Sequence, residues 1–340
     1  MSYECTVAID AMGGDHGPDV ILPATAAALQ KHRKLSIILT GDTEVLEASA
    51  RKHGVELGGR LQIKHASQIV EMHDDPRLAV RKKKDSSMRV AIDLVSQGEA
   101  QAVVSAGNTG ALVGTAKFVL KTLPGIDRPA ICTTIPSING HTHMLDLGAN
   151  VDCTAEHLFQ FAVMGSELSK AIDNEVQPRV GLLNIGSEDS KGNAQVKAAH
   201  ALMVDAPINY IGFVEGDDIY MGDVDVVVCD GFIGNVSLKT SEGVAKMISR
   251  FMKQEFKTNL LTMFLGLFAI PVLMKFKKRI DPRAYNGASL LGLSGIVIKS
   301  HGSADDFGYA NAIDIAVLEI RKSVPEHIRS SMEPLLEKAV

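Results

Sequence analysis

An apolar run that ends in a polar, glycine-bearing loop recurs six times along this chain of 340 residues. Short runs rich in valine and isoleucine predict buried strands, and glycine permits the tight turns that follow them. Because the carboxyl ends of parallel strands lie along one edge of a sheet, we expect the six loops to meet there. The runs and their loops are 7–10 with 12–17, 102–105 with 107–110, 144–146 with 148–150, 180–184 with 186–187, 224–229 with 230–235, and 296–298 with 301–303.

The second of these junctions shows the pattern most clearly. Ala102 to Ser105 predicts a strand, Gly107 and Gly110 a turn, and Thr109 the cap of a helix that reaches about Lys121. Such a junction points backbone N–H groups and the positive end of a helix at one place, which suits a phosphate or a developing oxyanion. A plain connection is the alternative, and the recurrence of the pattern favours a site.

The order of predicted strands and helices indicates the fold class. Apolar strands alternate with amphipathic helices from residue 6 to residue 323, which predicts an α/β protein with a mostly parallel sheet and helices on both faces. At 46% hydrophobic residues the chain can bury a large core, so we expect a single α/β catalytic domain over 1–340.

Composition argues against several classes of protein. The net charge of −5 and the lack of zinc-finger or aromatic-basic motifs give no support for nucleic-acid binding. Four scattered cysteines without a Cys-x-x-Cys pair indicate reduced thiols and a cytoplasmic protein. The first five residues contain no basic stretch followed by an apolar one, so no secretory signal is expected.

A basic run lies between residues 74 and 88. It contains Arg81, Lys82, Lys83 and Lys84 in succession. One interpretation is the solvated end of a basic helix, and the other is a docking surface for an acidic partner or a phosphate-bearing substrate. Both remain open at this point.

Two histidines, His141 and His143, raise the question of a metal site. No third ligand follows them at a recognisable spacing, so we expect histidines of a loop and no metal.

The segment 246–283 departs from the α/β pattern. It holds nine Lys or Arg residues against two acidic residues, which gives a local charge of +7, and 17 uncharged residues from Thr258 to Met274. Wholly helical, those 17 residues would reach about 25 Å, short of a bilayer core of about 30 Å. We expect an inserted helical hairpin whose apolar tip, flanked by cations, contacts an anionic membrane surface. Burial of the hairpin in a dimer interface is the alternative, and the two can coexist.

Several catalytic motifs are missing from the sequence. No Gly-x-Gly-x-x-Gly follows a predicted strand, and no Walker A loop, Gly-x-Ser-x-Gly elbow or His-Glu-x-x-His is found. A covalent nucleophile is not indicated, although Ser105 and Cys229 lie at predicted strand ends. The remaining possibility is a site rich in backbone donors, Asn, Asp and His, which suits an anion held beside an electrophile.

Four unusual motifs occur in order and resemble those of the bacterial phosphate acyltransferase family. They are VAIDAMGGDH at 7–16, SAGNTG at 105–110, DLGANVD at 146–152 and DGFIGN at 230–235, and the likeness extends to 287–292 and 299–303. The resemblance implies a fold similar to phosphotransacetylases and isocitrate-dehydrogenase-like enzymes, a homodimer, no cofactor and peripheral membrane association. It also implies that orthophosphate takes a fatty acyl group from acyl carrier protein, and that a membrane acyltransferase then transfers it to glycerol 3-phosphate.

Our hypothesis for the mechanism is direct attack of phosphate on the thioester, without an acyl-enzyme. The amides of Gly107, Asn108 and Thr109, with Gly13 and Gly14, would cradle the phosphate. Asn150 and Asn235 would donate to the carbonyl oxygen, and His16 would protonate the leaving thiolate or orient phosphate. A structural His16 bonded to Asp10 is the alternative.

The complete expectation has four groups of residues. The catalytic residues are His16, Asp10, Asn150 and Asn235. The substrate-binding residues are Gly13, Gly14, Asp15, Ser105, Gly107, Asn108, Thr109, Gly148, Asn184, Gly186, Asp230, Gly231, Gly234 and His301. Carrier-protein docking falls to Arg81, Lys82, Lys83 and Lys84, and membrane contact to Leu260, Leu261, Phe264, Leu265 and Phe268.

Two other functions stay open from the sequence. One is a nicotinamide-dependent decarboxylating dehydrogenase of similar fold, which would bind NADH. The other is a membrane scaffold without catalytic activity, which leaves the six glycine loops unexplained.

Overall fold

The computed structural model describes residues 5–337, organised around one sheet of eleven strands in the order β3-β2-β1-β4-β11-β10-β5-β6-β9-β7-β8. Seven of the ten strand pairs are parallel, so the predicted mostly parallel sheet is confirmed. The strands are β1 (Cys5–Asp10), β2 (Leu35–Gly41), β3 (Leu61–His65), β4 (Ala102–Ser105), β5 (Ala130–Ser137), β6 (Gly140–Leu145), β7 (Val180–Leu183), β8 (Tyr210–Val214), β9 (Val226–Val228), β10 (Ala288–Leu291) and β11 (Ile296–Lys299).

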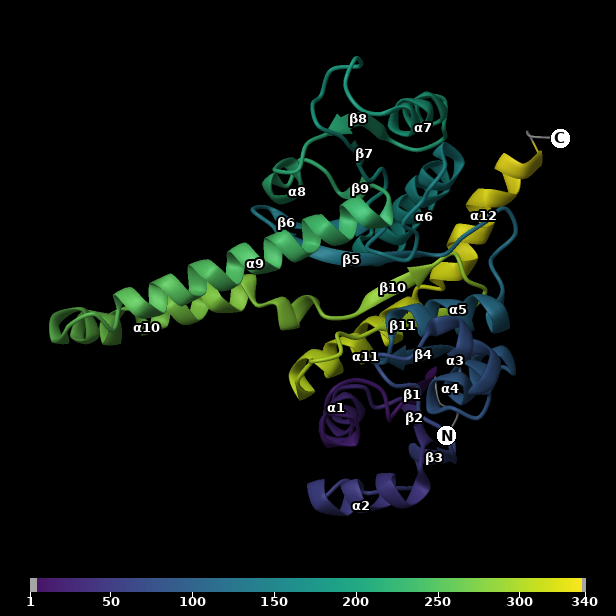
Figure 1. Cartoon of the computed structure of the whole chain (residues 1–340), viewed down its shortest axis with the longest axis vertical. Helices are drawn as coiled ribbons and strands as arrows, with labels where there is room; N and C mark the ends of the chain where they lie inside the picture. Colours follow the sequence, from purple (N-terminus) through teal and green to yellow (C-terminus); the bar gives the residue numbers. More distant parts are fainter. Residues whose placement is uncertain (1–4, 338–340) are drawn as a thin grey trace.

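Helices cover both faces of the sheet (Figure 1). On one face, α1, α2 and α11 pack on the first half and α6, α7 and α12 on the second; on the other face lie α4, α5 and α8. The helices are α1 (Pro18–Lys31), α2 (Thr43–His53), α3 (Pro76–Lys82), α4 (Ser87–Ser96), α5 (Thr109–Leu120), α6 (Ala155–Asp173), α7 (Ala194–Val204), α8 (Asp218–Met221), α9 (Gly231–Glu255), α10 (Leu260–Ile280), η1 (Pro282–Tyr285), α11 (Asp306–Arg321) and α12 (Val324–Glu337).

The apolar strand runs reflect this double cover. In β4, Val103 faces one core cluster and Val104 faces another, and both are fully buried. A strand with helices on both sides has no solvent face, so it reads as a continuous apolar run without polar alternation. The runs of valine and isoleucine in the sequence are therefore explained by burial on both faces.

The two halves of the sheet run in opposite directions. The strands β3, β2, β1, β4 and β11 are parallel to one another, and so are β6, β9, β7 and β8. Between them, β10 and β5 are joined to their neighbours by three successive antiparallel pairings, which leave the second half pointing opposite to the first.

A single row of paired residues crosses the sheet and separates the carboxyl ends of the two halves. Asp10, Ser105 and Lys299 each follow a residue of this row and lie on one side of it. Asp146 and Cys229 also follow residues of the row, but they lie on the opposite side. The expectation that all six loops share one edge is therefore wrong, because the two halves are antiparallel. The row consists of Ile9, Val104, Ile298, Ser289, Cys132, Leu145, Val228 and Leu182.

Helices α9 and α10 form a hairpin that projects far from the body of the molecule (Figure 1). The first helix begins at Gly231, well before the expected start of the insertion at residue 246. Among residues 5–337, none of the helices combines the length and the apolar character that a bilayer crossing requires.

Candidate functional site

The first loop cluster is built around the buried carboxylate of Asp10. Its Oδ2 accepts a hydrogen bond of 2.6 Å from Ser105 Oγ, and its Oδ1 accepts one of 2.6 Å from Ser87 Oγ. Burial raises the pKa of Asp10 above its ordinary value, although the two serine hydroxyls oppose that shift. Asp10 therefore fixes Ser105 and ties the ends of β1 and β4 to the start of α4.

Glycines allow the loops of this cluster to pack against that carboxylate. A Cβ on Gly13 would lie 2.5 Å from Asp10 Oδ2 and 2.9 Å from the backbone nitrogen of Gly107. Gly14 has a φ of +89°, a conformation that L side chains rarely adopt, and a Cβ there would lie 2.8 Å from Ala106 Cβ. The expected glycines Gly13, Gly14 and Gly107 are thus brought together.

The N-terminus of α5 supplies the backbone donors of this cluster. Asn108, and not the expected Thr109, is the N-cap: its Oδ1 accepts from Ala111 N at 3.0 Å. The Asn108 Nδ2 donates to the carbonyls of Met72 and Asp74, and Gly107 N donates to Ser105 Oγ, so these groups hold the loop itself. Among the described residues, the N–H groups of Thr109 and Gly110 have no such acceptor, and they lie at the positive end of the helix dipole.

Lys299 is a member of this cluster that the sequence analysis did not select. It is paired with Ser105 in the sheet, and its half-buried Nζ donates to the carbonyl of Ala106 at 3.3 Å and to the carbonyl of Ser300. Burial lowers the pKa of Lys299 to about 8, against the attraction of Asp10 and Asp15. A lysine that ends an apolar strand directly before a Ser-His-Gly-Ser loop was the signal that could have identified it.

Three more expected residues line the exposed side of this cluster. Asp15 and His16 are exposed, and Asp15 N donates to the carbonyl of Gly302 at 2.9 Å. The structural alternative for His16 does not hold, because the partners of Asp10 are Ser105, Ser87 and Met12. His301 Nδ1 lies 2.9 Å from Ser303 Oγ, and partial burial of the ring, together with the charge of Lys239, lowers the pKa of His301.

The second loop cluster is built around Asp146, which is also fully buried. Its Oδ1 accepts from the backbone nitrogens of Ile131 and Ala149, and its Oδ2 accepts from the backbone nitrogen of Asn150 at 2.7 Å. Burial raises the pKa of Asp146, and these amide hydrogens oppose the rise. Asp146 therefore shapes the loop 146–150 in the same way that Asp10 shapes the first cluster.

The Asn150 side chain is committed to this framework. Its Nδ2 donates to the carbonyl of Pro129 at 2.8 Å and to Asp146 Oδ2 at 2.9 Å, which uses both hydrogens of the amide. We therefore assign Asn150 a supporting role in place of the expected donation to a substrate oxygen.

The start of α9 closes over loop 146–150. Asp230 caps the helix through a 2.9 Å hydrogen bond from Ile233 N. A Cβ on Gly231 would lie 2.6 Å from the carbonyl of Asn150, and one on Gly234 only 1.9 Å from the carbonyl of Asp146. The two glycines thus permit direct contact between the helix backbone and the loop.

Asn235 lies beside Gly148 at this contact. Gly148 has a φ of +114°. A Cβ added to it would lie 3.6 Å from the Asn235 side chain. Asn235 is exposed, and its amide has no side-chain partner among the described residues. Of the two expected asparagine donors, Asn235 alone keeps its amide available for a substrate.

The loop after β7 carries Asn184 and Gly186. The buried Nδ2 of Asn184 has no hydrogen-bond partner within residues 5–337, and a Cβ on Gly192 would lie 2.7 Å from Asn184 Oδ1. Gly186 is buried beside Glu188 and Lys191. This loop follows β7, the neighbour of β9, and therefore belongs to the side of the second cluster.

Helix α9 connects the two clusters. It begins on loop 146–150, and two turns later the charge of Lys239 acts on Lys299 and His301 in the first cluster. The same helix therefore lies near the loops of both clusters.

The basic run lies next to the first cluster. Helix α3 begins at Pro76. A Cβ added to Gly110, at the start of α5, would lie 2.7 Å from the Pro76 ring, so the two helix starts are in close contact. Arg81, Lys82 and Lys84 are exposed, whereas Lys83 forms a 2.5 Å ion pair with Asp74 and donates to the carbonyl of Ile69. Three of the four expected docking cations therefore face solvent, and the fourth holds the loop 69–74.

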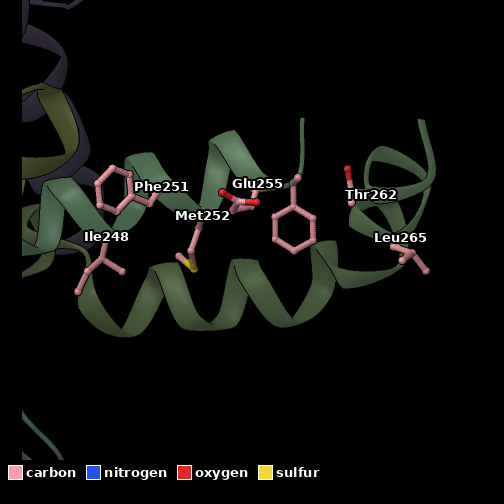
Figure 2. A pocket seen from close by; sticks show the side chains of 7 residues that line it. Ile248, Phe251, Met252, Glu255, Thr262 and Leu265 are labelled. Atoms are coloured by element: carbon pink, nitrogen blue, oxygen red, sulfur yellow. The ribbon is translucent and has the colours of Figure 1, made fainter. Parts of the chain in front are cut away.

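The hairpin presents apolar side chains to solvent. Among the expected contact residues, Leu261, Phe264, Leu265 and Phe268 are each more than half exposed, while the side chain of Leu260 lies outside the described residues. An open pocket of about 440 Å³ separates the two helices (Figure 2). Its lining is Ile248, Phe251, Met252, Glu255, Phe256, Thr262 and Leu265.

The expectation that His141 and His143 belong to a loop is wrong. Both lie on β6, and the carboxylate of Asp173, 30 residues further along the chain, contacts both rings.

Comparison of sequences relates the chain to one family. The sequence model described as "Fatty acid synthesis protein" matches residues 5–327. The chain is 63% identical to the phosphate acyltransferase of Methylococcus capsulatus over 327 residues, which cover 96% of each chain. It is 60% identical to that of Alkalilimnicola ehrlichii, with 99% and 98% of the two chains covered, and 54% identical to that of Legionella pneumophila, with 98% of each covered.

Solved structures show the same fold at low sequence identity. The EutD phosphotransacetylase from Staphylococcus aureus superposes with a TM-score of 0.61 at 17% identity, covering 94% of this chain and 95% of that chain. A phosphotransacetylase from Streptococcus pyogenes gives a TM-score of 0.61 at 19% identity, with 94% of each chain covered.

Proposed function

This chain belongs to the phosphate acyltransferase family, and we propose that it transfers a fatty acyl group from acyl carrier protein to orthophosphate. Its activity is that of an acyltransferase acting on phosphate, and the product is an acyl phosphate. The proposal further includes acyl carrier protein as the acyl donor, contact with a membrane surface, and assembly as a homodimer.

The observation that carries the proposal is the meeting of Lys299 with the N-terminus of α5. The Lys299 ammonium donates to the carbonyl of Ala106, two residues before the helix cap Asn108. The open N–H groups of Thr109 and Gly110 and this cation form a site for a dianion, because backbone donors, helix dipole and side-chain charge act in the same direction. Phosphate would be held there by its non-reacting oxygens.

The reaction balances without a covalent enzyme intermediate. A phosphate oxygen attacks the thioester carbonyl carbon, the carbon–sulfur bond breaks, and the proton of hydrogen phosphate moves to the leaving thiolate. Fixing phosphate in line with the carbonyl contributes up to about 7–11 kcal/mol when orientation is ideal. Exposed His16, at the rim of the first cluster, is placed to carry that proton, and Asn235 is our candidate donor to the carbonyl oxygen.

For the carrier protein we propose docking on the exposed cations at the end of α3 and directly after it. Arg81, Lys82 and Lys84 face solvent beside the first cluster, and acyl carrier protein is acidic. Reversing these three charges should raise the Michaelis constant for the carrier and flatten its salt dependence. Reversal of Lys197, an exposed lysine on α7, is the matched control. A lower turnover with an unchanged Michaelis constant would instead indicate a folding role for the three cations.

For the hairpin we propose contact with an anionic membrane surface, in a homodimer that presents paired tips. Its exposed leucines and phenylalanines and its flanking cations support this. The contact would place the acyl phosphate near a membrane acyltransferase that uses it on glycerol 3-phosphate.

The test of the whole proposal is direct. The protein is incubated with palmitoyl-acyl carrier protein and radiolabelled phosphate, and a labelled, hydroxylamine-sensitive acyl phosphate is sought. Its formation by the natural chain is expected, with slower formation by Lys299→Met at low phosphate concentration. If neither the acyl phosphate nor free carrier thiol forms, the proposed reaction fails; tight binding of NADH in a fluorescence titration would then favour the dehydrogenase alternative.

A further inference from the structure

Three metal-ligating side chains meet away from the two loop clusters. His141 and His143 lie two residues apart on β6 and therefore on the same face of the strand, and Asp173 is the last residue of α6. Asp146, the residue that follows β6, is three residue steps from His143, about 10 Å of extended chain. The group is thus distinct from the proposed substrate site.

The geometry of the group is that of two imidazoles directed at one carboxylate. His141 Nε2 lies 3.0 Å from Asp173 Oδ1, and His143 Nε2 lies 2.7 Å from Oδ2. The rings are inclined at 74° to each other, so their nitrogens approach the carboxylate from different directions. One donor atom from each residue lies within 4.8 Å of the others, a spacing that small side-chain rotations would convert to coordination of one ion.

The surrounding contacts orient these groups as metal ligands are oriented. Thr134 Oγ1 lies 3.3 Å from the second ring nitrogen of His143, so that ring can carry its hydrogen on Nδ1 and offer Nε2 as a lone pair. Ser169 Oγ donates to Asp173 Oδ2 at 3.0 Å, which fixes the carboxylate. Hydrogen bonds of this kind set the tautomer of a ligating histidine and the direction of a ligating carboxylate.

The exposure of the three side chains differs in a useful way. The side chain of His143 is 4% exposed and that of Asp173 is 18% exposed, whereas that of His141 is 37% exposed. An ion can therefore enter from the side of His141 and keep water as its remaining ligand. We propose that His141, His143 and Asp173 bind one divalent transition-metal ion, of the class represented by Zn²⁺.

The donor set and its position define what the ion would do. Two imidazoles and one carboxylate suit Zn²⁺ and related ions, and they disfavour Mg²⁺, which prefers oxygen ligands. The ion would join the start of β6 to the end of α6, and so stabilise the fold without taking part in acyl transfer. Binding converts each Nε2 from a hydrogen donor to a lone-pair donor, with loss of a proton wherever the imidazole was charged.

The test uses full-length protein stripped of metal with a chelator. Calorimetric titration with ZnCl₂ should give one site per chain, and thermal unfolding should move to higher temperature in Zn²⁺ but not in Mg²⁺. The variants His141→Gln and Asp173→Asn should weaken Zn²⁺ binding by at least tenfold and remove the thermal shift. Thr134→Val, which removes only the orienting hydroxyl, should weaken it by roughly 10- to 100-fold.

A matched control is present in the chain. His53 forms a 3.1 Å contact with Asp19 but belongs to no group of three metal-ligating side chains among the described residues, so His53→Gln should bind Zn²⁺ like the natural chain. Co²⁺ should give a ligand-field absorption that His141→Gln lacks. The proposal is overturned if the natural chain shows no Zn²⁺ binding, or if His141→Gln and Asp173→Asn bind as tightly as the natural chain.

Discussion

Ser105 and Lys299 are register partners at the ends of the neighbouring parallel strands β4 and β11. The hydroxyl of Ser105 is bound to the buried carboxylate of Asp10, and the ammonium of Lys299 is bound to the carbonyl of Ala106. One pair of sheet positions thus fixes both the loop that precedes α5 and the cation beside it. Lys299 is the member of the pair that carries a charge.

Replacing Lys299 with Met should weaken phosphate binding. A hydrogen bond to a charged group contributes about 1.5–3 kcal/mol, so we expect the Michaelis constant for phosphate to rise by roughly 10- to 100-fold. Steady-state kinetics with phosphate as the varied substrate measures this. Lys197→Met is the surface control, and an unchanged constant in Lys299→Met would remove Lys299 from the phosphate site.

The pH dependence of phosphate binding should follow the same lysine. Because burial lowers the pKa of Lys299 to about 8, the cation is present below that pH and is lost as the pH rises through it. The Michaelis constant for phosphate should therefore increase above about pH 8. In Lys299→Arg, whose side chain stays charged, the alkaline increase should disappear; its persistence would assign the titration to another group.

Stability should depend on the buried Glu319. This side chain accepts a hydrogen bond from Ser289, and burial raises its pKa from 4.5 to about 7. The folded state therefore holds the proton more tightly than the unfolded state, and stability falls as the pH rises from 4.5 to 7, by roughly 3 kcal/mol. Urea unfolding should show Glu319→Gln to be more stable than the natural chain at pH 8 but not at pH 4.5. Exposed Glu326→Gln should show no such difference.

Alanine substitutions at two glycines of α9 should have opposite effects on the stability of the protein. A Cβ on Gly234 would overlap the carbonyl of Asp146, so Gly234→Ala should destabilise the protein by at least about 3 kcal/mol. A Cβ on Gly243, on the same helix, would meet no atom of the described residues within 4 Å apart from its own helix backbone and chain neighbours, so Gly243→Ala should stabilise the protein by about 1 kcal/mol through helix propensity. Chemical denaturation compares them, and equal effects would contradict the close contact at Gly234.

The hairpin should bind anionic vesicles through its apolar side chains. Replacing Leu261, Phe264 and Phe268 together with Ser should abolish sedimentation with phosphatidylglycerol vesicles, because these side chains supply the area that lipid would cover. Val176→Ser, which changes an exposed valine outside the hairpin, is the control. Unaltered sedimentation of the triple variant would leave the dimer interface as the role of the hairpin.

Much of the fold could be predicted from the sequence, but less of the candidate site could. Burial on both faces makes each strand a continuous apolar run, so the strands and the mostly parallel sheet were predictable. The reversal of strand direction at β10 and β5 was not predictable, because an apolar run does not indicate the direction of its strand within the sheet. For the same reason we expected all six loops to lie along one edge of the sheet.

Individual side chains were harder to assign for a related reason. An asparagine in a polar loop can cap a helix, bind a neighbouring loop or face a substrate, and spacing does not distinguish these tasks. Asn108 and Asn150 serve the framework, whereas Asn235 does not. Asp173 joined His141 and His143 only through the packing of α6 on β6, a contact without a local pattern.

The continuity of α9 has one more consequence. The helix is about 37 Å long at its 25 residues, and its first turn contacts loop 146–150 while its far end meets α10 at the tip of the hairpin (Figure 1). Because the helix is unbroken, it holds the tip of the hairpin at a constant distance from Asn235 and Lys239 near its base. The reach of the hairpin from the polar loops is therefore set by the number of residues in α9.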